Sequence, residues 1–454
     1  MRRPLTFAVV TTAMLAVGPA SAAQPDGGAA DIRLAEIAGA PSAARVEADV
    51  RRLAAFGTRH TLSDTSSAIR GIGAARRWLF DEFTRISAGC AGCLEVFYVA
   101  EVVAGDPEGR LPRDTRVVNV VAVQRGRADP GRFVLMTAHY DSRASDIMDA
   151  ESDAPGANDD ASGVAGVLEA ARVLSRYAFD GSIAYAALAG EEQGLYGGHI
   201  LARHATANGW RVEGVLNNDI IGNVTGASGA ASDAVVRVFG PGIPATTSER
   251  DLRRLLTTGG ELDTPSRQLM RYVDRIADRY HPDLDVMMIY RLDRYRRGGD
   301  HAAFFDAGFP AVRFTELYED WSRQHQDLRV EDGIAYGDVP DAVDFAYAAR
   351  IIALNATTLA SLAWAPAAPD SVTISGATTP NTTLRWAAGR AGDLAGYRVY
   401  WRAPTAPQWE HSRWVADATD VTLEGVIIDN HFFGVVAVDR DGYESRAVFP
   451  QPGQ

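Results

Sequence analysis

Residues 183–194 have the sequence Ile-Ala-Tyr-Ala-Ala-Leu-Ala-Gly-Glu-Glu-Gln-Gly, an apolar run that leads straight into two adjacent glutamates. A short, unbroken apolar run that ends at glycine is typical of a strand buried on both faces. Glu191 and Glu192 would therefore lie just beyond the end of that strand. In open α/β sheets the loops after the strands form a crevice, so paired acids there predict a functional site.

Further strands and helices alternate on both sides of this run. Residues 117–123, 133–138 and 212–216 are short apolar runs whose β-branched and aromatic content predicts strands. From Ser162 onward, apolar residues recur at steps of three and four, which predicts a helix with one apolar face. Strands that alternate with helices predict an α/β fold: a doubly wound, mixed and mainly parallel sheet flanked by helices. Further helices are predicted at residues 46–56, 68–86 and 338–362.

Histidines and acids follow several of these strands. His139 comes directly after residues 133–138, and Asp219 comes shortly after residues 212–216. Imidazoles and carboxylates bind zinc, and a two-metal hydrolase also needs a carboxylate that bridges the metals. Asp159 lies in a Gly-rich segment where the backbone can approach ions closely, so we expect it to be the bridging ligand. The alternative is that Asp159 and Asp160 only favour the start of the next helix through its dipole.

The remaining acids divide into two roles. His139 and Asp141 are two residues apart, so on extended backbone they face the same side, and we expect Asp141 to orient the imidazole. A surface hydrogen bond is the alternative for that pair. Two adjacent glutamates cannot both point at one spot from a strand, so we expect Glu192 to bind metal and Glu191 to be the general base. A solvated acidic turn is the alternative.

These segments, taken in order, closely resemble the zinc aminopeptidases of the M28 family. The segments are Thr-Ala-His139-Tyr-Asp141-Ser, Gly-Ala-Asn-Asp159-Asp-Ala-Ser-Gly, Gly-Glu191-Glu192-Gln-Gly-Leu-Tyr-Gly and Asn-Asn-Asp219-Ile-Ile-Gly, with Gly-Asp300-His301 and Gln-His325-Gln-Asp downstream. The resemblance implies a zinc exopeptidase fold over residues 41–362 and two Zn²⁺ ions. It implies that one zinc is bound by His139 and Asp219, the other by Glu192 and His325, with Asp159 as the bridge. A cis peptide bond after Asp159 is also implied.

The fifth ligand is less well determined than the others. His281, His301 and His325 all lie in the same region of the chain. Spacing and the family pattern alone choose His325 as the ligand. His301 follows Asp300 and fits a position in the substrate pocket, so we expect both Asp300 and His301 to lie in that pocket.

The chain is acidic, with 58 Asp and Glu residues against 45 Lys and Arg. Nucleic acids are bound through basic surfaces, so we expect no nucleic-acid partner. Residues 1–22 begin with two arginines, continue through an apolar run and end in Ala-Ser-Ala, which predicts a signal peptide cleaved near Ala22-Ala23. The protein would then be periplasmic or secreted. The apolar run is well short of the roughly 20 residues that span a bilayer, so a membrane anchor is the weaker alternative and no stable membrane insertion is expected.

Two further features concern the exported chain. Cys90 and Cys93 are the only cysteines, and in an exported protein they predict a local disulfide. At residues 363–370 Ala and Pro dominate and charge is low, as in a linker. Residues 371–450 contain short alternating strands between turns, which predicts a small all-β sandwich, and they resemble a fibronectin type III domain.

The predicted sandwich is interpreted as a spacer or stabilising module. Its aromatic residues Trp386, Tyr397 and Trp401 fall where a core needs them. Contact with carbohydrate or with a protein partner is the alternative. Removal of residues 370–454 is therefore expected to leave hydrolysis of short substrates largely intact.

The residues favour a dizinc aminopeptidase that hydrolyses the first bond of peptide substrates. Water activated between the metals would attack the carbonyl, and Glu191 would relay its proton to the leaving amine. A carboxypeptidase or a glutaminyl cyclase of the same family stays open. Arginines at 291, 294, 296 and 297 suit a substrate carboxylate, whereas cyclases of this fold use one zinc and fit five ligands poorly. A catalytically inactive binding protein is the third hypothesis, which the full ligand set disfavours.

Overall fold

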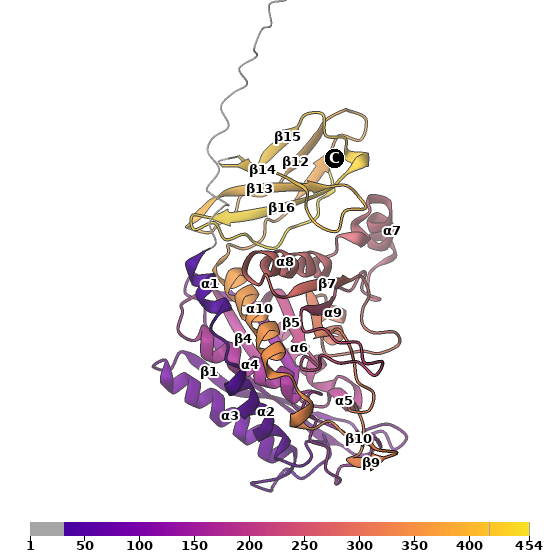
Figure 1. Cartoon of the computed structure of the whole chain (residues 1–454). Coiled ribbons are helices and arrows are strands. Elements are labelled where there is room, and N and C mark those ends of the chain that lie inside the picture. The colour runs from indigo at the N-terminus through magenta and orange to yellow at the C-terminus, as the bar shows by residue number, and fades with distance from the viewer. Residues whose placement is uncertain (1–30, 417, 454) are drawn as a thin grey trace, which may run out of the picture.

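An eight-stranded sheet forms the centre of the computed structural model, which describes residues 31–416 and 418–453 (Figure 1). Its strands lie in the order β1-β2-β4-β3-β5-β8-β6-β7. They are β1 (Leu94–Val103), β2 (Thr115–Gln124), β3 (Asp129–His139), β4 (Gly181–Leu188), β5 (Arg211–Asn218), β6 (Val235–Phe239), β7 (Asp285–Ile289) and β8 (Ala311–Glu316). The predicted signal peptide, residues 1–22, lies outside the described residues.

Parallel and antiparallel pairs both occur in this sheet. The pairs β3–β4, β3–β5, β5–β8 and β6–β7 are parallel. The pairs β1–β2, β2–β4 and β6–β8 are antiparallel. Four of the seven pairs are parallel, so the predicted mixed, mainly parallel sheet is confirmed. Because β3, β4 and β5 run in the same direction, their carboxyl ends meet at one edge.

Helices cover both faces of the sheet. On one face α6 and α9 contact the strands, and on the other α3, α4, α8 and α10 do so, with α1 packed against α10 and α2 against α4 and α10. The helices are α1 (Ile32–Ala38), α2 (Ala43–Ala54), α3 (Gly71–Gly89), α4 (Ala161–Leu174), α5 (Glu191–Gly194), α6 (Tyr196–Ala207), α7 (Glu249–Thr258), α8 (Pro265–Tyr280), α9 (His301–Asp306) and α10 (Phe345–Trp364). A parallel sheet covered on both faces explains why its strands are continuous apolar runs.

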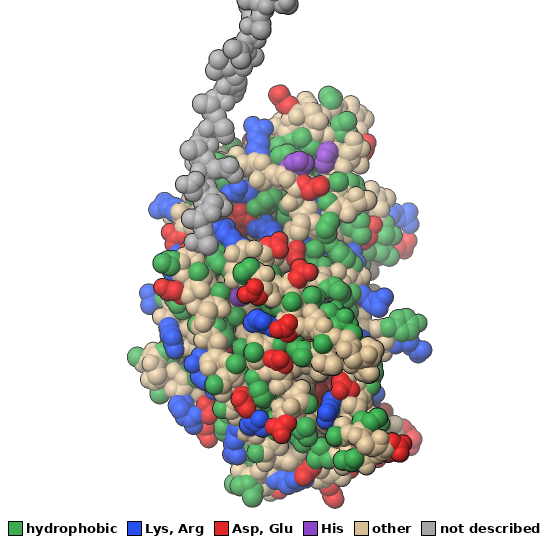
Figure 2. Space-filling model, viewed as in Figure 1, with side chains coloured by type: hydrophobic (Ala, Val, Ile, Leu, Met, Phe, Trp, Pro, Cys, Tyr) green, Lys and Arg blue, Asp and Glu red, His purple; other side chains and the backbone are tan. Residues whose placement is uncertain are grey.

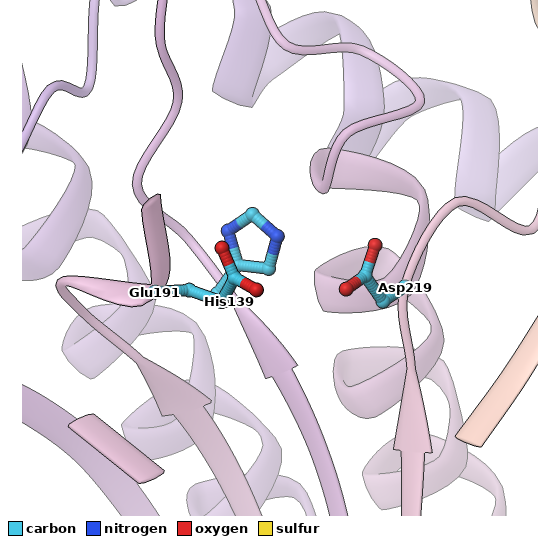
Figure 3. Close-up of side chains that lie close together, drawn as sticks. All are labelled: His139, Glu191 and Asp219. Carbon is cyan, nitrogen blue, oxygen red and sulfur yellow. The ribbon is translucent and has the colours of Figure 1, made fainter. Parts of the chain in front are cut away.

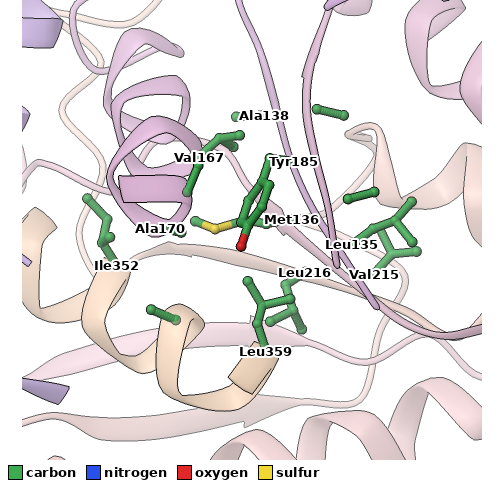
Figure 4. Close-up of a cluster of buried hydrophobic side chains, with 14 of the residues drawn as sticks. Leu135, Met136, Ala138, Val167, Ala170, Tyr185, Val215, Leu216, Ile352 and Leu359 are labelled. Atoms are coloured by element: carbon green, nitrogen blue, oxygen red, sulfur yellow. The ribbon is translucent and has the colours of Figure 1, made fainter. Parts of the chain in front are cut away.

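The core lies between the sheet and the helices. Figure 4 shows part of it, where side chains of the central strands meet those of α4 and α10; those labelled include Met136, Tyr185, Val167, Ile352 and Leu359. Helix α10 is long and apolar enough to span a membrane, as no other helix among the described residues is. It is packed against α4 and β3 in the core, and this burial accounts for its apolar composition.

Local boundaries follow from capping residues. Helix α4 begins at Ala161, one residue before the predicted start, and the Asp160 carboxylate accepts a hydrogen bond from the Gly163 backbone N–H at 3.0 Å. Helix α10 begins later than predicted, because Pro340 starts a separate turn of 3₁₀-helix, and Asp344 caps α10 instead. The predicted disulfide between Cys90 and Cys93 is confirmed in the turn after α3.

Residues 372–453 form a separate C-terminal lobe of two small sheets, drawn in yellow and orange in Figure 1. One sheet has the strand order β15-β12-β11-β17 and the other β14-β13-β16. The strands are β11 (Thr373–Ser375), β12 (Thr382–Arg385), β13 (Leu394–Arg402), β14 (His411–Val415), β15 (Asp420–Leu423), β16 (Phe432–Asp439) and β17 (Gln451–Pro452). A core that includes Trp386, Tyr397 and Val399 lies within this lobe. Helix α10 runs through Trp364, into the range predicted as a linker.

A buried ion cluster joins the C-terminal lobe to the rest of the chain. The Asp263 carboxylate accepts hydrogen bonds from Arg271 of α8 at 2.5 Å and from Arg402 of β13 at 2.8 Å. All three side chains are 2% exposed or less. Nearby, Glu444 of the C-terminal lobe pairs with Arg275 of α8 at 2.6 Å. Buried charges therefore join the two lobes, and removal of the C-terminal lobe would leave Asp263 and Arg271 without Arg402. That hydrolysis of short substrates survives this removal stays a prediction.

Charged side chains of both signs are interspersed over the face seen in Figure 2, in both lobes. Exposed ion pairs occur among the described residues, such as Arg253 with Glu249 at 3.2 Å, in which both side chains are largely exposed. Exposed pairs contribute little to stability, whereas the loss of one partner from a buried pair leaves a charge without water or a counterion. The buried cluster around Asp263 is therefore the stronger link.

Replacement of Asp263 by asparagine is expected to lower the free energy of unfolding by about 3–5 kcal/mol, because two buried guanidinium groups lose their counterion. Denaturant unfolding measures the change. As a matched control, Glu249→Gln removes an exposed partner and is expected to change stability by less than about 1 kcal/mol. Equal changes in the two variants would contradict a special role for the buried cluster.

Candidate metal centre

Three strand ends place the predicted site residues together. His139 is the last residue of β3, and Asp219 follows β5 directly. Glu191 and Glu192 follow β4 after Gly190, whose φ of 76° lies in the left-handed region that glycine tolerates. Figure 3 shows the side chains of His139, Glu191 and Asp219 close together at these strand ends. The parallel arrangement of β3, β4 and β5 thus brings distant parts of the sequence to one place.

The predicted ligands form two neighbouring groups. Within each group, one ligand atom from each residue lies within 4.8 Å of those of the others; the groups are His139, Glu191 and Asp219, and Asp159, Glu192 and His325. Asp159 connects them, because its Oδ1 is 3.1 Å from Nε2 of His139 and its Oδ2 is 3.1 Å from Nε2 of His325. One carboxylate thus faces both imidazoles, which is the geometry of a bridging ligand.

These spacings suit zinc. Ligand atoms about 2.0–2.2 Å from a tetrahedral zinc lie about 3.3 Å from one another. Nε2 of His325 lies 3.2 Å from Oε1 of Glu192, close to that value. Oε1 of Glu192 is buried and accepts no hydrogen bond from the described residues. Buried carboxylate oxygens are normally satisfied, so this atom suits a bound cation.

The electrostatics of the site also favour bound cations. Burial raises the pKa of Glu191 well above its ordinary value, and the neighbouring Glu192 and Asp219 carboxylates add to the rise. Burial by itself lowers the pKa of His325, but the nearby Glu192 and Asp159 outweigh it and raise that pKa to about 10. A group of carboxylates this close together repels itself unless positive charge lies between them.

Asp141 fixes the orientation of its neighbours. Its carboxylate accepts hydrogen bonds from the backbone N–H of Glu191 at 3.3 Å and of Glu192 at 3.1 Å. Nδ1 of His139, on the side of the ring away from Asp159, lies 3.1 Å from the backbone carbonyl oxygen of Asp141 and 3.6 Å from its Oδ1. Asp141 therefore contacts both the imidazole and the turn that carries the two glutamates.

The bridging position of Asp159 is held by residues that sequence reasoning did not identify. The buried Asp338 carboxylate accepts hydrogen bonds from the backbone N–H of Asp159 at 2.7 Å and of Asn158 at 2.9 Å. The fully buried Arg59 donates to backbone carbonyls of the same loop, including that of Gly156 at 2.9 Å. The peptide bond from Asp159 to Asp160 is cis, as the family resemblance implied. Asp338 and Arg59 gave no signal in the sequence, because their role depends on the folded loop.

Arg313 is a second residue that was missed. It is fully buried in β8, with Nη2 2.8 Å from Oδ1 of Asp219 and Nη1 2.7 Å from Oδ2 of Asp293. Burial lowers the pKa of Arg313, but the Asp219 and Asp293 charges outweigh it, so the guanidinium is held in its charged form. Its position inside the apolar run of β8 was a signal, since a charge in a buried strand needs a partner.

Asp300 and His301 lie at the start of α9 and are both buried. Burial with the nearby Asp141 and Asp219 charges raises the pKa of Asp300 to about 7. Nε2 of His301 is 2.6 Å from the carbonyl oxygen of Leu292 and is thus turned to the protein interior. Neither residue lines the open cleft at the site, where the sequence analysis expected them.

An open cleft of about 370 Å³ gives access to the site. Five residues of the two metal-ligand groups line it, His139 excepted. The rest of the wall is mostly polar. It consists of Gly194, Leu195, Gly298, Gln324 and the arginines at positions 110, 143, 294, 296 and 297. The ligand atoms are therefore accessible from solvent.

Comparisons with known proteins agree with this geometry. The model of Peptidase family M28 matches residues 119–343. A probable zinc metalloprotease of Leptosphaeria maculans is 44% identical over 413 residues, which are 91% of this chain and 95% of that protein. One from Pyrenophora tritici-repentis is 43% identical over 415 residues, covering 91% of this chain and 85% of that protein. The Legionella pneumophila LapA aminopeptidase has the same fold, with a TM-score of 0.52 and 18% identity over 73% of this chain and 75% of that one. The chain therefore belongs to peptidase family M28 and is a zinc metalloprotease.

Proposed function

We propose that this M28 protein holds two zinc ions and removes amino-terminal residues from peptides. The observation that carries the proposal is the position of Asp159, whose two oxygens each lie 3.1 Å from a different imidazole. His139 and Asp219 would hold one ion and Glu192 and His325 the other, with Asp159 shared. Zinc bound there supplies a Lewis acid that polarises a carbonyl and lowers the pKa of water.

The chain's own groups account for the movement of protons. Glu191 is the one member of the two groups that the ligand assignment leaves free, and its carboxylate faces the same space as His139 and Asp219. It takes the proton from the attacking water and passes it to the leaving amine. Asp141 acts through the turn and the imidazole it holds, so it is a positioning residue.

One observation favours an aminopeptidase over other activities of the family: the Legionella relative in fold is named as an aminopeptidase. Two complete ligand groups favour a two-metal hydrolase over a one-zinc glutaminyl cyclase, and they disfavour an inactive binding protein.

We further propose that residues 1–22 direct export to the periplasm or the medium. The C-terminal lobe is proposed to be fibronectin type III-like, with a stabilising role ahead of carbohydrate or protein binding.

The activity is tested by metal analysis of the purified protein together with a panel of aminoacyl and carboxyl-terminal chromogenic substrates. About two zinc ions per chain and release from aminoacyl substrates are expected. Chelation should abolish turnover and added zinc should restore it. Release from carboxyl-terminal substrates alone would replace the proposal with a carboxypeptidase.

The adjacent glutamates provide a matched pair of variants. Glu191→Gln is expected to keep both metals and to lose turnover by at least about a hundredfold, because general base catalysis contributes about 10²–10⁴-fold. Glu192→Gln is expected to lower the metal content instead. Metal analysis and kcat measured on the same preparations separate the two effects. If Glu191→Gln retained most of the activity, its role as base would be wrong.

The histidine assignment has its own test. His325→Ala is expected to reduce zinc content or affinity, because Nε2 of His325 faces both Asp159 and Glu192. His301→Ala is expected to leave the zinc content unchanged, because its Nε2 is turned toward Leu292. Zinc titration with a colorimetric chelator measures both. The reverse result would make His301 the zinc ligand in place of His325.

A further inference from the structure

The wall of the cleft is unusual for its charge. Outside the two metal-ligand groups no described carboxylate lines it, and Leu195 is its one apolar side chain. Five arginines line it instead, at positions 110, 143, 294, 296 and 297. A cleft that selected large apolar side chains would be lined mainly by hydrophobic and aromatic residues. This wall lacks the surface to recognise such a side chain.

Two of these arginines are already partnered. Arg294 and Arg297 each lie 3.1 Å from the buried Glu319 carboxylate. They form a fixed edge of the cleft, and one carboxylate is shared between them. Their net charge toward the cleft is therefore smaller than their number implies.

The other three arginines of the wall, at positions 110, 143 and 296, have no carboxylate partner in the part of the chain described. Arg110 donates to the backbone carbonyl of Glu192 at 3.0 Å, and Arg143 donates to those of Ala144 and Ser145 at 3.1 and 2.8 Å. Arg296 makes no hydrogen bond or ion pair with the described residues, although it lines the cleft. Its φ of 59° lies in the left-handed region, which is uncommon for a residue with a side chain. Left-handed backbone of this kind often marks a functional position.

These arginines could serve only to neutralise the metal-ligand carboxylates, which is the alternative to a role in substrate binding. The four carboxylates of the two groups carry about four negative charges, and two divalent ions supply four positive charges. In the loaded enzyme the ligand groups are then balanced without the arginines. The positive charge of the wall remains for the substrate.

Resting on the proposed function, we infer that the enzyme selects peptides with a carboxylate close to the scissile bond. The guanidinium groups of Arg296, Arg143 and Arg110 would bind it, because a guanidinium matches a carboxylate in charge and in fork geometry. The carboxylate can come from an acidic side chain or from the terminus of a short peptide, since both present the same chemistry to the cleft.

Matched substrates separate these sources. Ala-Glu against Ala-Gln tests an acidic side chain after the cleaved bond, and Glu-4-nitroanilide against Gln-4-nitroanilide tests one before it. Ala-Ala against Ala-Ala-amide tests the terminal carboxylate. At least one acid is expected to exceed its amide tenfold or more in kcat/KM, mainly through KM, and the ratio should fall with added salt.

Two arginines of one loop provide the variant and its control. Arg296→Gln is expected to reduce the acid-to-amide ratio severalfold. Arg291→Gln, an exposed residue of the same loop that does not line the cleft, is expected to leave the ratio unchanged. Circular dichroism and zinc content check that both variants are folded and loaded. Equal loss of the ratio in both variants would overturn the role of the cleft.

A binding measurement keeps this inference separate from the proposed activity. Calorimetric titration of the zinc-loaded Glu191→Gln protein with Ala-Glu and Ala-Gln reports recognition without turnover. Tighter binding of the acid, lost in a protein that also carries Arg296→Gln, supports the inference even if no test substrate is cleaved. Hydrolysis of all acids and amides at equal rates, with equal binding, overturns the inference and leaves the aminopeptidase proposal standing. Absence of hydrolysis with a retained binding preference for the acid supports the inference and overturns the aminopeptidase proposal.

Discussion

Mutual repulsion among carboxylates at one edge of the sheet is the constraint on which the site depends. Asp159, Glu191, Glu192 and Asp219 lie in two groups whose ligand atoms are within 4.8 Å of one another. Such a cluster is unfavourable unless cations or buried donors balance it. The fold supplies part of that balance through the buried Arg313 beside Asp219. The remaining negative charge is of the sign that bound divalent metals neutralise.

The same constraint explains why the loops around the site are so firmly held. The Asp338 carboxylate accepts hydrogen bonds from two backbone N–H groups of the bridging loop, and Arg59 donates to two of its carbonyls, those of Pro155 and Gly156. Asp141 holds the turn of the two glutamates in the same way. Each of these is a long-range contact between a buried charged group and backbone. They hold the ligand atoms in place before any metal arrives, so less ordering is needed when it binds.

The sequence was sufficient for features that depend on local pattern. The strand before Glu191, the helix after Asp160 and the order of the ligand-bearing segments are all local, and the fold class follows from their alternation. Contacts between distant segments were not predictable. The pairing of Asp263 with Arg402 spans more than a hundred residues and depends on how the C-terminal lobe docks. Asp300 has the sequence context of a pocket residue, yet the packing of α9 buries it.

Helix α10 connects the two lobes mechanically. It contacts α1, α2, α4, α8 and the central strands, and its last residue, Trp364, stacks on Tyr443 of the C-terminal lobe at 5.2 Å between ring centroids. Arg132 of β3 donates to the carbonyls of Leu362 and Ala363 near the end of the same helix. A fluctuation that loosens the smaller lobe therefore disturbs the helix that crosses the larger one. Unfolding of the smaller lobe should therefore also weaken the larger one.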